Sequence, residues 1–229
     1  MFTKPTILKP GDTIATVSLS WGGPYCFPHK YEAGKQQLQN AHNVTVIEMP
    51  HTCTDADDIY KHPEKRASDL MAAFADPDIK AIISTIGGDD SIRMLPYIDL
   101  NIIRDNPKIF LGYSDTTVSH FICMAAGLRS FYGPAIMAGF GENGGLFPYM
   151  KDSVYRTLCT TEIIGEVKPN LDGWTAEQAD WGNIENQKTK RPLTPSHGPK
   201  ILQGKGKATG HLIGGCVEVL EMLKGTSVW

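Results

Sequence analysis

The 229-residue sequence predicts an α/β protein whose first part is an open parallel sheet, of the Rossmann-like or flavodoxin-like kind. Short segments with the composition of strands alternate with segments that carry apolar residues at helical spacing. Strands that alternate with helices form parallel sheets with right-handed crossovers. After about residue 158 the chain becomes rich in Pro, Gly, Asp, Asn, Lys and Thr. We therefore expect an N-terminal α/β domain over residues 1–160, and a crossover with an irregular second region over residues 161–229.

The predicted strands are short and apolar, or alternate apolar with small polar residues. The first covers residues 12–20 and runs into a loop at residues 21–24. The last covers residues 108–111 and ends at the turn that begins with Gly112. Between them we expect strands over residues 44–48 and 80–86.

The predicted helices are recognised by apolar stripes and by the residues at their ends. Pro63 and Glu64 suit the first turn of one helix. Gly127 and Gly225 lie where helices end, because glycine readily adopts the left-handed backbone of that position. The expected helices cover residues 30–41, 63–74, 91–97, 118–128 and 217–224.

Charge and composition exclude several classes of partner. Lys and Arg total 22 against 25 Asp and Glu, and the charges are scattered, so there is no basic stripe for a nucleic acid. The N-terminus lacks an apolar signal segment, and no apolar run has membrane-spanning length. We expect a soluble, cytoplasmic protein that acts on a small molecule, with neither nucleic acid nor membrane as a partner.

The cysteines and histidines do not have the spacing of a disulfide framework or a metal site. The five cysteines are far apart and odd in number, and the histidines lack a His-x-x-x-His pattern. We therefore expect no metal ion and no cofactor. The cysteines are Cys26, Cys53, Cys123, Cys159 and Cys216.

A turn at residues 112–117 places Ser114 between an apolar strand and a helix, the position at which hydrolases present a nucleophile. The amide of Asp115 would then be the first oxyanion donor, close to the positive end of the helix dipole. The signal is incomplete, because Thr116 replaces the second glycine of the Gly-x-Ser-x-Gly elbow. The alternative is a turn whose serine or aspartate caps the helix.

Functional crevices of open α/β sheets lie beyond the carboxyl ends of the strands. Three predicted loops meet there, at residues 20–24, 87–90 and 112–115. The Gly87-Gly88 pair would let backbone amides approach a reacting oxygen, which makes Gly88 a second candidate oxyanion donor. A dinucleotide site is the alternative, but the glycine spacing is wrong and the following Asp89-Asp90 would repel a pyrophosphate.

Trp174 and Trp181 lie seven residues apart in a polar context. Two exposed indoles would form a stacking platform for a planar ligand. The alternative is that one or both pack beneath the loop as its apolar anchors.

Four separated motifs together resemble the LD-carboxypeptidase and microcin C immunity (MccF) family of serine peptidases. The resemblance covers essentially the whole chain, and the paired tryptophans and the Gly-Gly-Cys sequence favour the MccF-like branch. The motifs lie at residues 87–99, 112–117, 132–134 and 214–226.

This resemblance implies a Ser114 nucleophile, oxyanion amides around Gly88 and Asp115, a Ser-Glu-His triad, a homodimer and no metal. In the MccF-like branch it implies hydrolysis of the amide between an aspartyl residue and a modified adenylate, with tryptophans stacking on the base. In the LD-carboxypeptidase branch it implies release of a terminal D-alanine from a muropeptide. Both reactions pass through a serine ester.

The sequence departs from the family pattern at the triad. The family's glutamate and histidine lie beyond the Gly-Gly-Cys helix, and neither Glu218, Glu221, His120 nor His211 matches them. We expect a truncated or proteolysed product of a longer enzyme, with an incomplete, smaller C-terminal α/β domain and little activity of its own. The alternative is a protein that binds a peptidyl-nucleotide or muropeptide without cutting it.

Overall fold

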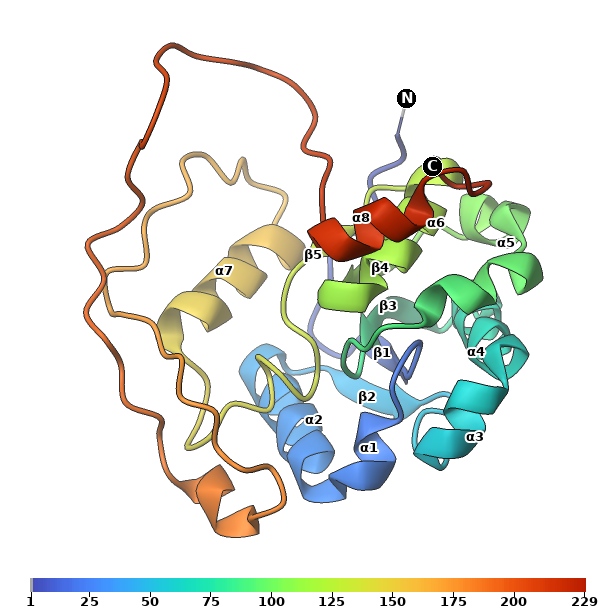
Figure 1. The fold of residues 1–229 in the computed structure, drawn as a ribbon, viewed down its shortest axis with the longest axis horizontal. Helices are drawn as coiled ribbons and strands as arrows, with labels where there is room; N and C mark the ends of the chain where they lie inside the picture. Colours follow the sequence, from blue (N-terminus) through green and yellow to red (C-terminus); the bar gives the residue numbers. More distant parts are fainter. Residues whose placement is uncertain (1) are drawn as a thin grey trace.

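The computed structural model, which describes residues 2–229, contains a five-stranded sheet in the order β2-β1-β3-β4-β5 (Figure 1). All neighbouring strands are parallel. This is the strand order of flavodoxin-like sheets, so the predicted α/β fold class is confirmed. The strands are β1 (Thr13–Val17), β2 (Thr45–Glu48), β3 (Ile79–Ser84), β4 (Ile109–Gly112) and β5 (Phe131–Tyr132).

Side chains of the central strands alternate between two apolar layers, as the pleat of a strand requires. Phe110 of β4 packs in one layer, and its neighbours Ile109 and Leu111 pack in the other. The first layer contains buried residues of α4 (Pro63–Ala75), α5 (Leu100–Asp105), α6 (Thr117–Ala125) and α8 (Val217–Leu223). The second contains residues of α2 (Pro28–His42) and α7 (Pro148–Leu158).

The helices follow the local signals with a few differences. Helices α2, α4 and α7 each begin with a proline, which suits the first helical turn because its missing N–H has no partner there. The segment predicted as a helix over residues 91–97 is the 3-10 helix η1 (Ser91–Tyr97), which contains Pro96. None of the helices in residues 2–229 is both long and apolar enough to cross a bilayer. The remaining elements are α1 (Gly23–Cys26), α3 (Ala56–Lys61), η2 (Ser114–Thr116) and η3 (Ile184–Lys188).

Between α7 and α8 the chain forms a long irregular segment, residues 159–216, in which η3 is the one helical element (Figure 1, orange to red). It returns to place α8 beside α6, where Val219 and Leu223 join the apolar layer of the sheet. The last part of the chain therefore completes the core of the first part. The domain boundary near residue 160 stays a prediction.

Candidate active site

The three glycine-containing loops predicted to meet at the carboxyl ends of the strands do lie together. The Trp21 amide donates to Gly87 O at 3.3 Å, which joins the loop after β1 to the loop after β3. The Ser91 amide donates to Asp115 Oδ2, and the Ser91 hydroxyl donates to Asp115 O, both at 2.8 Å. These bonds join the loop after β3 to the turn after β4.

Ser114 has a left-handed backbone, with φ of 61°. This conformation is unfavourable for a residue with a Cβ, by about 1–2 kcal/mol, and such residues cluster at functional sites. The turn is held by two short bonds, in which Thr116 Oγ1 donates to Tyr113 O at 2.6 Å and Thr117 Oγ1 donates to Ser114 O at 2.7 Å. The chain therefore turns sharply at Ser114, between the end of β4 at Gly112 and the start of α6 at Thr117.

The alternative of a simple capping turn does not describe this segment. The residue before α6 is Thr116, and its side chain makes no capping bond to that helix. The carboxylate of Asp115 is buried and accepts from Ser91 instead of from an amide of α6. The side chains of this turn hold neighbouring loops in place.

Both glycines of the Gly87-Gly88 pair are required by close approach. A Cβ on Gly87 would lie 2.9 Å from Ser114 Cβ. Gly88 has φ of 156°, and a Cβ there would lie 2.0 Å from Ser20 Oγ. Gly87 thus brings bare backbone against the serine turn, where amide donors of an oxyanion hole are needed, and Gly88 packs against the loop after β1. The assignment of Gly88 and Asp115 as those donors stays a prediction.

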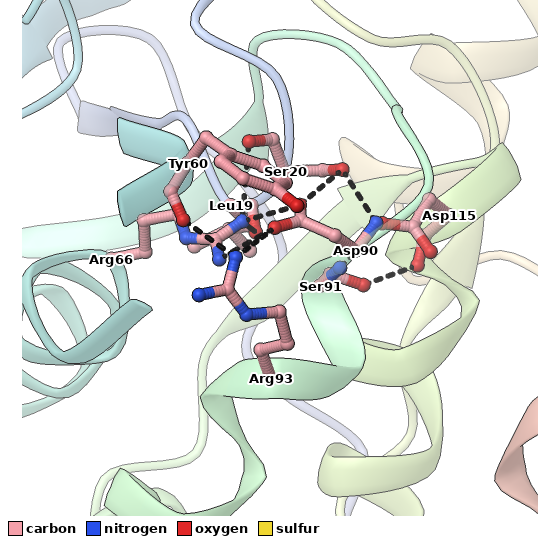
Figure 2. A network of polar contacts seen from close by, with 8 residues as sticks. All are labelled: Leu19, Ser20, Tyr60, Arg66, Asp90, Ser91, Arg93 and Asp115. Atoms are coloured by element: carbon pink, nitrogen blue, oxygen red, sulfur yellow. Dashed lines mark hydrogen bonds and ion pairs between the residues drawn. The ribbon is translucent and has the colours of Figure 1, made fainter. Parts of the chain in front are cut away.

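A buried ion pair anchors the loop that follows the glycine pair (Figure 2). Arg66 is fully buried, and its two terminal nitrogens donate to the two oxygens of Asp90 at 2.7 and 3.1 Å. The same guanidinium donates to Leu19 O at 3.1 Å and Ser20 O at 3.2 Å. Arg93, which is more exposed, also donates to Asp90, at 3.1 Å. Arg66 therefore joins the loop after β3 to the loop after β1.

The sequence reasoning did not identify Arg66. Its signal is a charged residue at a core position: Arg66, Leu70 and Phe74 follow one another at intervals of four on the buried face of α4. A lone charge on an apolar helical stripe requires a buried partner. Asp90, in the motif already singled out, is that partner.

His120 has a structural role. Its Nε2 lies 3.0 Å from Gly112 O, and its Nδ1 lies 2.8 Å from Ser130 Oγ. Nε2 must donate to the carbonyl, so Nδ1 accepts from the serine. Burial lowers the pKa of His120 to about 4, so the ring is neutral at physiological pH. Both ring nitrogens are hydrogen-bonded to residues other than Ser114, so His120 is not placed to act as its base.

The third and fourth motifs also reach the serine turn. Tyr132 accepts a hydrogen bond from the Ser114 amide at 2.9 Å. The Cys216 amide donates to Thr117 Oγ1 at 2.9 Å, and a Cβ on Gly215 would lie 2.4 Å from the Thr117 side chain. The other three sequence motifs therefore all contact the motif at residues 112–117.

Glu218 and Glu221 lie on α8 and are exposed. Glu218 accepts from Cys216 Sγ at 3.0 Å, and Glu221 pairs with Lys224 at 2.7 Å. Neither carboxylate is hydrogen-bonded to a histidine of the described chain.

An open cavity of about 920 Å³ lies beside the serine turn, with Tyr113 and Tyr132 in its wall. Trp181 lines it and packs edge-to-face against Phe27, with ring centroids 5.8 Å apart. Lys30 Nζ lies 5.5 Å from the Trp181 ring centroid. The lining also includes Pro134, Met137, Glu142, Asn143, Phe147, Met150, Glu177 and Arg191.

The two tryptophans have different positions. Trp181 is part of the cavity wall, whereas Trp174 is not among the described residues that line it. Trp174 is 53% exposed and exchanges two backbone hydrogen bonds with Thr194. The structure thus separates the predicted pair.

Comparison with known proteins agrees with this arrangement. Residues 14–133 match the model of the LD-carboxypeptidase N-terminal domain of the S66 peptidases. A carboxypeptidase homologue of Vibrio cholerae is 34% identical over 227 residues, which are 96% of this chain and 64% of the relative. The microcin C7 self-immunity protein MccF of Escherichia coli is 34% identical over 226 residues, 97% of this chain and 62% of MccF. The chain thus spans less than two thirds of the length of these relatives.

Solved structures show the same fold. An MccF-like protein of Streptococcus pneumoniae in complex with AMP matches with a TM-score of 0.84 and 34% identity, over 95% of this chain and 64% of that protein. MccF in complex with aspartyl sulfamoyl adenosine matches with a TM-score of 0.84 and 30% identity, over 100% of this chain and 67% of MccF. This chain, with its serine turn, glycine pair and cavity, therefore belongs to the LD-carboxypeptidase (S66) family of peptidases.

Proposed function

We propose that this chain carries the nucleophile of an MccF-like serine hydrolase, which cleaves the amide between an aspartyl residue and a modified adenylate. The observation that carries the proposal is Ser114, held at a left-handed φ of 61° against Gly87 and beside an aromatic cavity. A serine on such a turn is exposed to a substrate from the side where amides are available to an oxyanion.

The proposed reaction has two steps. Ser114 Oγ attacks the amide carbonyl while a general base takes its proton, and the N–H groups of Gly88 and Asp115 stabilise the tetrahedral oxyanion. The intermediate then collapses, the base returns the proton to the departing nitrogen, and an acyl-serine ester remains. Water hydrolyses the ester and regenerates the serine.

The base and its orienting carboxylate are the histidine and glutamate implied by the family resemblance. No residue of this chain matches them, and the proposal places them outside these 229 residues. The 64% coverage of the S. pneumoniae structure supports that placement. We also propose a homodimer, which the family resemblance implies, and a cytoplasmic location, which the sequence composition predicts.

The cavity is proposed to hold the nucleoside part of the substrate. Trp181 and Phe27 supply an aromatic wall of the kind on which a nucleobase stacks. The AMP complex of the S. pneumoniae relative supports a nucleotide ligand in this family. Because Trp181 lines the cavity, we assign base stacking to Trp181; a contribution from Trp174 would require its loop to move.

The test is a comparison of two substrates on the protein encoded by the complete reading frame. An aspartyl-adenylate amide analogue and a muropeptide ending in D-alanine are each incubated with the wild type and with Ser114→Ala, and products are identified by mass spectrometry. Release of the adenylate by the wild type alone supports the proposal. Release of D-alanine alone would favour the muropeptide LD-carboxypeptidase.

A non-catalytic binding protein is the remaining alternative. A fluorophosphonate probe discriminates, because it labels only an activated serine. Stoichiometric labelling at Ser114 in the complete protein requires an activated serine and supports the hydrolase, whereas binding of either substrate without labelling or cleavage would overturn the hydrolase proposal.

A further inference from the structure

Residues 174–194 form a loop, called here the Trp181 loop, that closes on itself at its base. The Trp174 amide donates to Thr194 O at 3.0 Å, and the Thr194 amide donates to Trp174 O at 2.7 Å. Most side chains of the loop are exposed, so little apolar burial holds it in place. Segments of this kind open locally at low free energy unless polar contacts fasten them.

A bidentate ion pair joins this loop to the wall of the cavity. Arg191 donates from Nε to Glu142 Oε1 at 2.8 Å and from Nη2 to Glu142 Oε2 at 2.5 Å. The Glu142 side chain is only 5% exposed, and this hydrogen-bonded carboxylate raises the pKa of Arg191. Parallel bonds between an arginine and a carboxylate are stronger and more directional than those between neutral groups. Arg191 also donates to Glu177 O at 2.8 Å, so it joins both sides of the loop.

The Glu142 carboxylate is also connected, through Asn143, to Lys30, which lies over the Trp181 ring. Glu142 Oε1 accepts from the Asn143 amide at 2.9 Å, and the Asn143 side chain accepts from Lys30 Nζ at 2.5 Å. Lys30 in turn lies over the Trp181 ring. Glu142 thus links the loop that carries the indole to the helix against which the indole packs.

We propose that Arg191 and Glu142 are positioning residues that hold Trp181 in the cavity wall and thereby determine the affinity for a nucleotide. This inference rests on the proposed nucleotide specificity of the cavity. If the loop is only partly closed, the apparent dissociation constant of the nucleotide rises in inverse proportion to the closed fraction. The ion pair acts on binding through Trp181 and does not act on the serine.

The experiment measures AMP binding to the protein encoded by the complete reading frame by isothermal titration calorimetry, together with hydrogen exchange of its backbone amides. The variants are Arg191→Gln, Glu142→Gln and the intermediate Arg191→Lys, which keeps the charge but loses the fork. Glu185→Gln is the matched control, because it breaks an ion pair with Lys188 on the same loop whose two side chains are 68% and 71% exposed.

We expect Arg191→Gln and Glu142→Gln to weaken AMP binding roughly tenfold, as a loop closed about a tenth of the time would. Arg191→Lys should weaken it less, and Glu185→Gln should leave it unchanged. Protection of the amides in residues 174–194 should fall in the first two variants, while the amides of the sheet keep their protection. Wild-type affinity in Arg191→Gln, or loss of protection throughout the sheet, would overturn the inference.

The two proposals fail in different ways. If the wild type does not bind AMP, the nucleotide specificity of the cavity is wrong. The hydrogen exchange comparison then decides the positioning role by itself: selective loss of protection in residues 174–194 supports it, and unchanged protection refutes it.

Discussion

The Arg66–Asp90 ion pair offers a sharp test of how the active-site loops are held. The Arg66 side chain is 0% exposed and that of Asp90 is 13% exposed, so the pair lies in a largely desolvated environment. Removal of one partner of a buried pair leaves an uncompensated charge and destabilises a protein by about 3–5 kcal/mol. Asp90→Asn removes the negative charge at nearly constant volume. We expect it to reduce the free energy of unfolding by about 3 kcal/mol, the lower end of that range, because the amide oxygen still accepts one bond.

The measurement is equilibrium unfolding in urea at neutral pH, with the midpoint and slope both fitted. Arg93→Gln is the matched control, because it breaks the second ion pair of the same aspartate, with an arginine side chain that is 40% exposed. An exposed pair contributes less than about 1 kcal/mol, so this variant should unfold close to the wild type.

A double variant separates lost charge from lost packing. Arg66→Met with Asp90→Leu replaces both charges by apolar groups and should be more stable than Asp90→Asn alone, because no unpaired charge remains buried. If Asp90→Asn unfolds within about 1 kcal/mol of the wild type, or no differently from Arg93→Gln, the pair does not anchor the loop as argued.

Three further predictions follow from single residues. Burial lowers the pKa of His120 from 6.5 to about 4, so the unfolded chain binds more protons than the folded chain between these pH values. The free energy of unfolding should therefore be highest above about pH 6.5 and fall as the pH drops toward 4. In urea titrations over this pH range, His120→Gln should show a smaller fall. The free energy of unfolding of Ser114→Gly should exceed that of Ser114→Ala by about 1 kcal/mol, because only glycine is free of strain at φ of 61°. Equal urea midpoints for the two variants would contradict the strained turn. Gly34→Ala should destabilise by about 1–3 kcal/mol despite its better helix propensity, because its Cβ would lie 2.1 Å from Ile136 O; an unchanged thermal midpoint would show that the contact relaxes freely.

Sequence patterns located the main elements because those patterns are local. Strands β1 to β4 and helices α2, α4, α6 and α8 were predicted to within a few residues, since their apolar periodicity extends over several positions. Helices α1, α3 and α5, with four to six residues each, and the two-residue strand β5 were missed, because segments this short contain too few residues for a period to be recognised. The eleven-residue helix α7 was also missed; its buried residues are Val154 and Leu158, so its apolar stripe is short.

The sequence also indicated where the candidate site would be. The carboxyl ends of parallel strands share one edge of a sheet, so the loops after β1, β3 and β4 had to meet. It could not show that Trp181 lines the cavity while Trp174 stays outside, because both lie in the same polar stretch with similar neighbours. That difference depends on which indole meets Phe27.

The sequence by itself determined the parallel α/β architecture, the serine turn and its glycine pair, and the family to which they belong. Only the tertiary structure decided the backbone of Ser114 and the ion pairs Arg66–Asp90 and Arg191–Glu142. The partners of these pairs are 24 and 49 residues apart, so sheet order and loop closure bring them together. Local propensity acts over a few residues, whereas the pairing of a buried charge depends on every element packed around it.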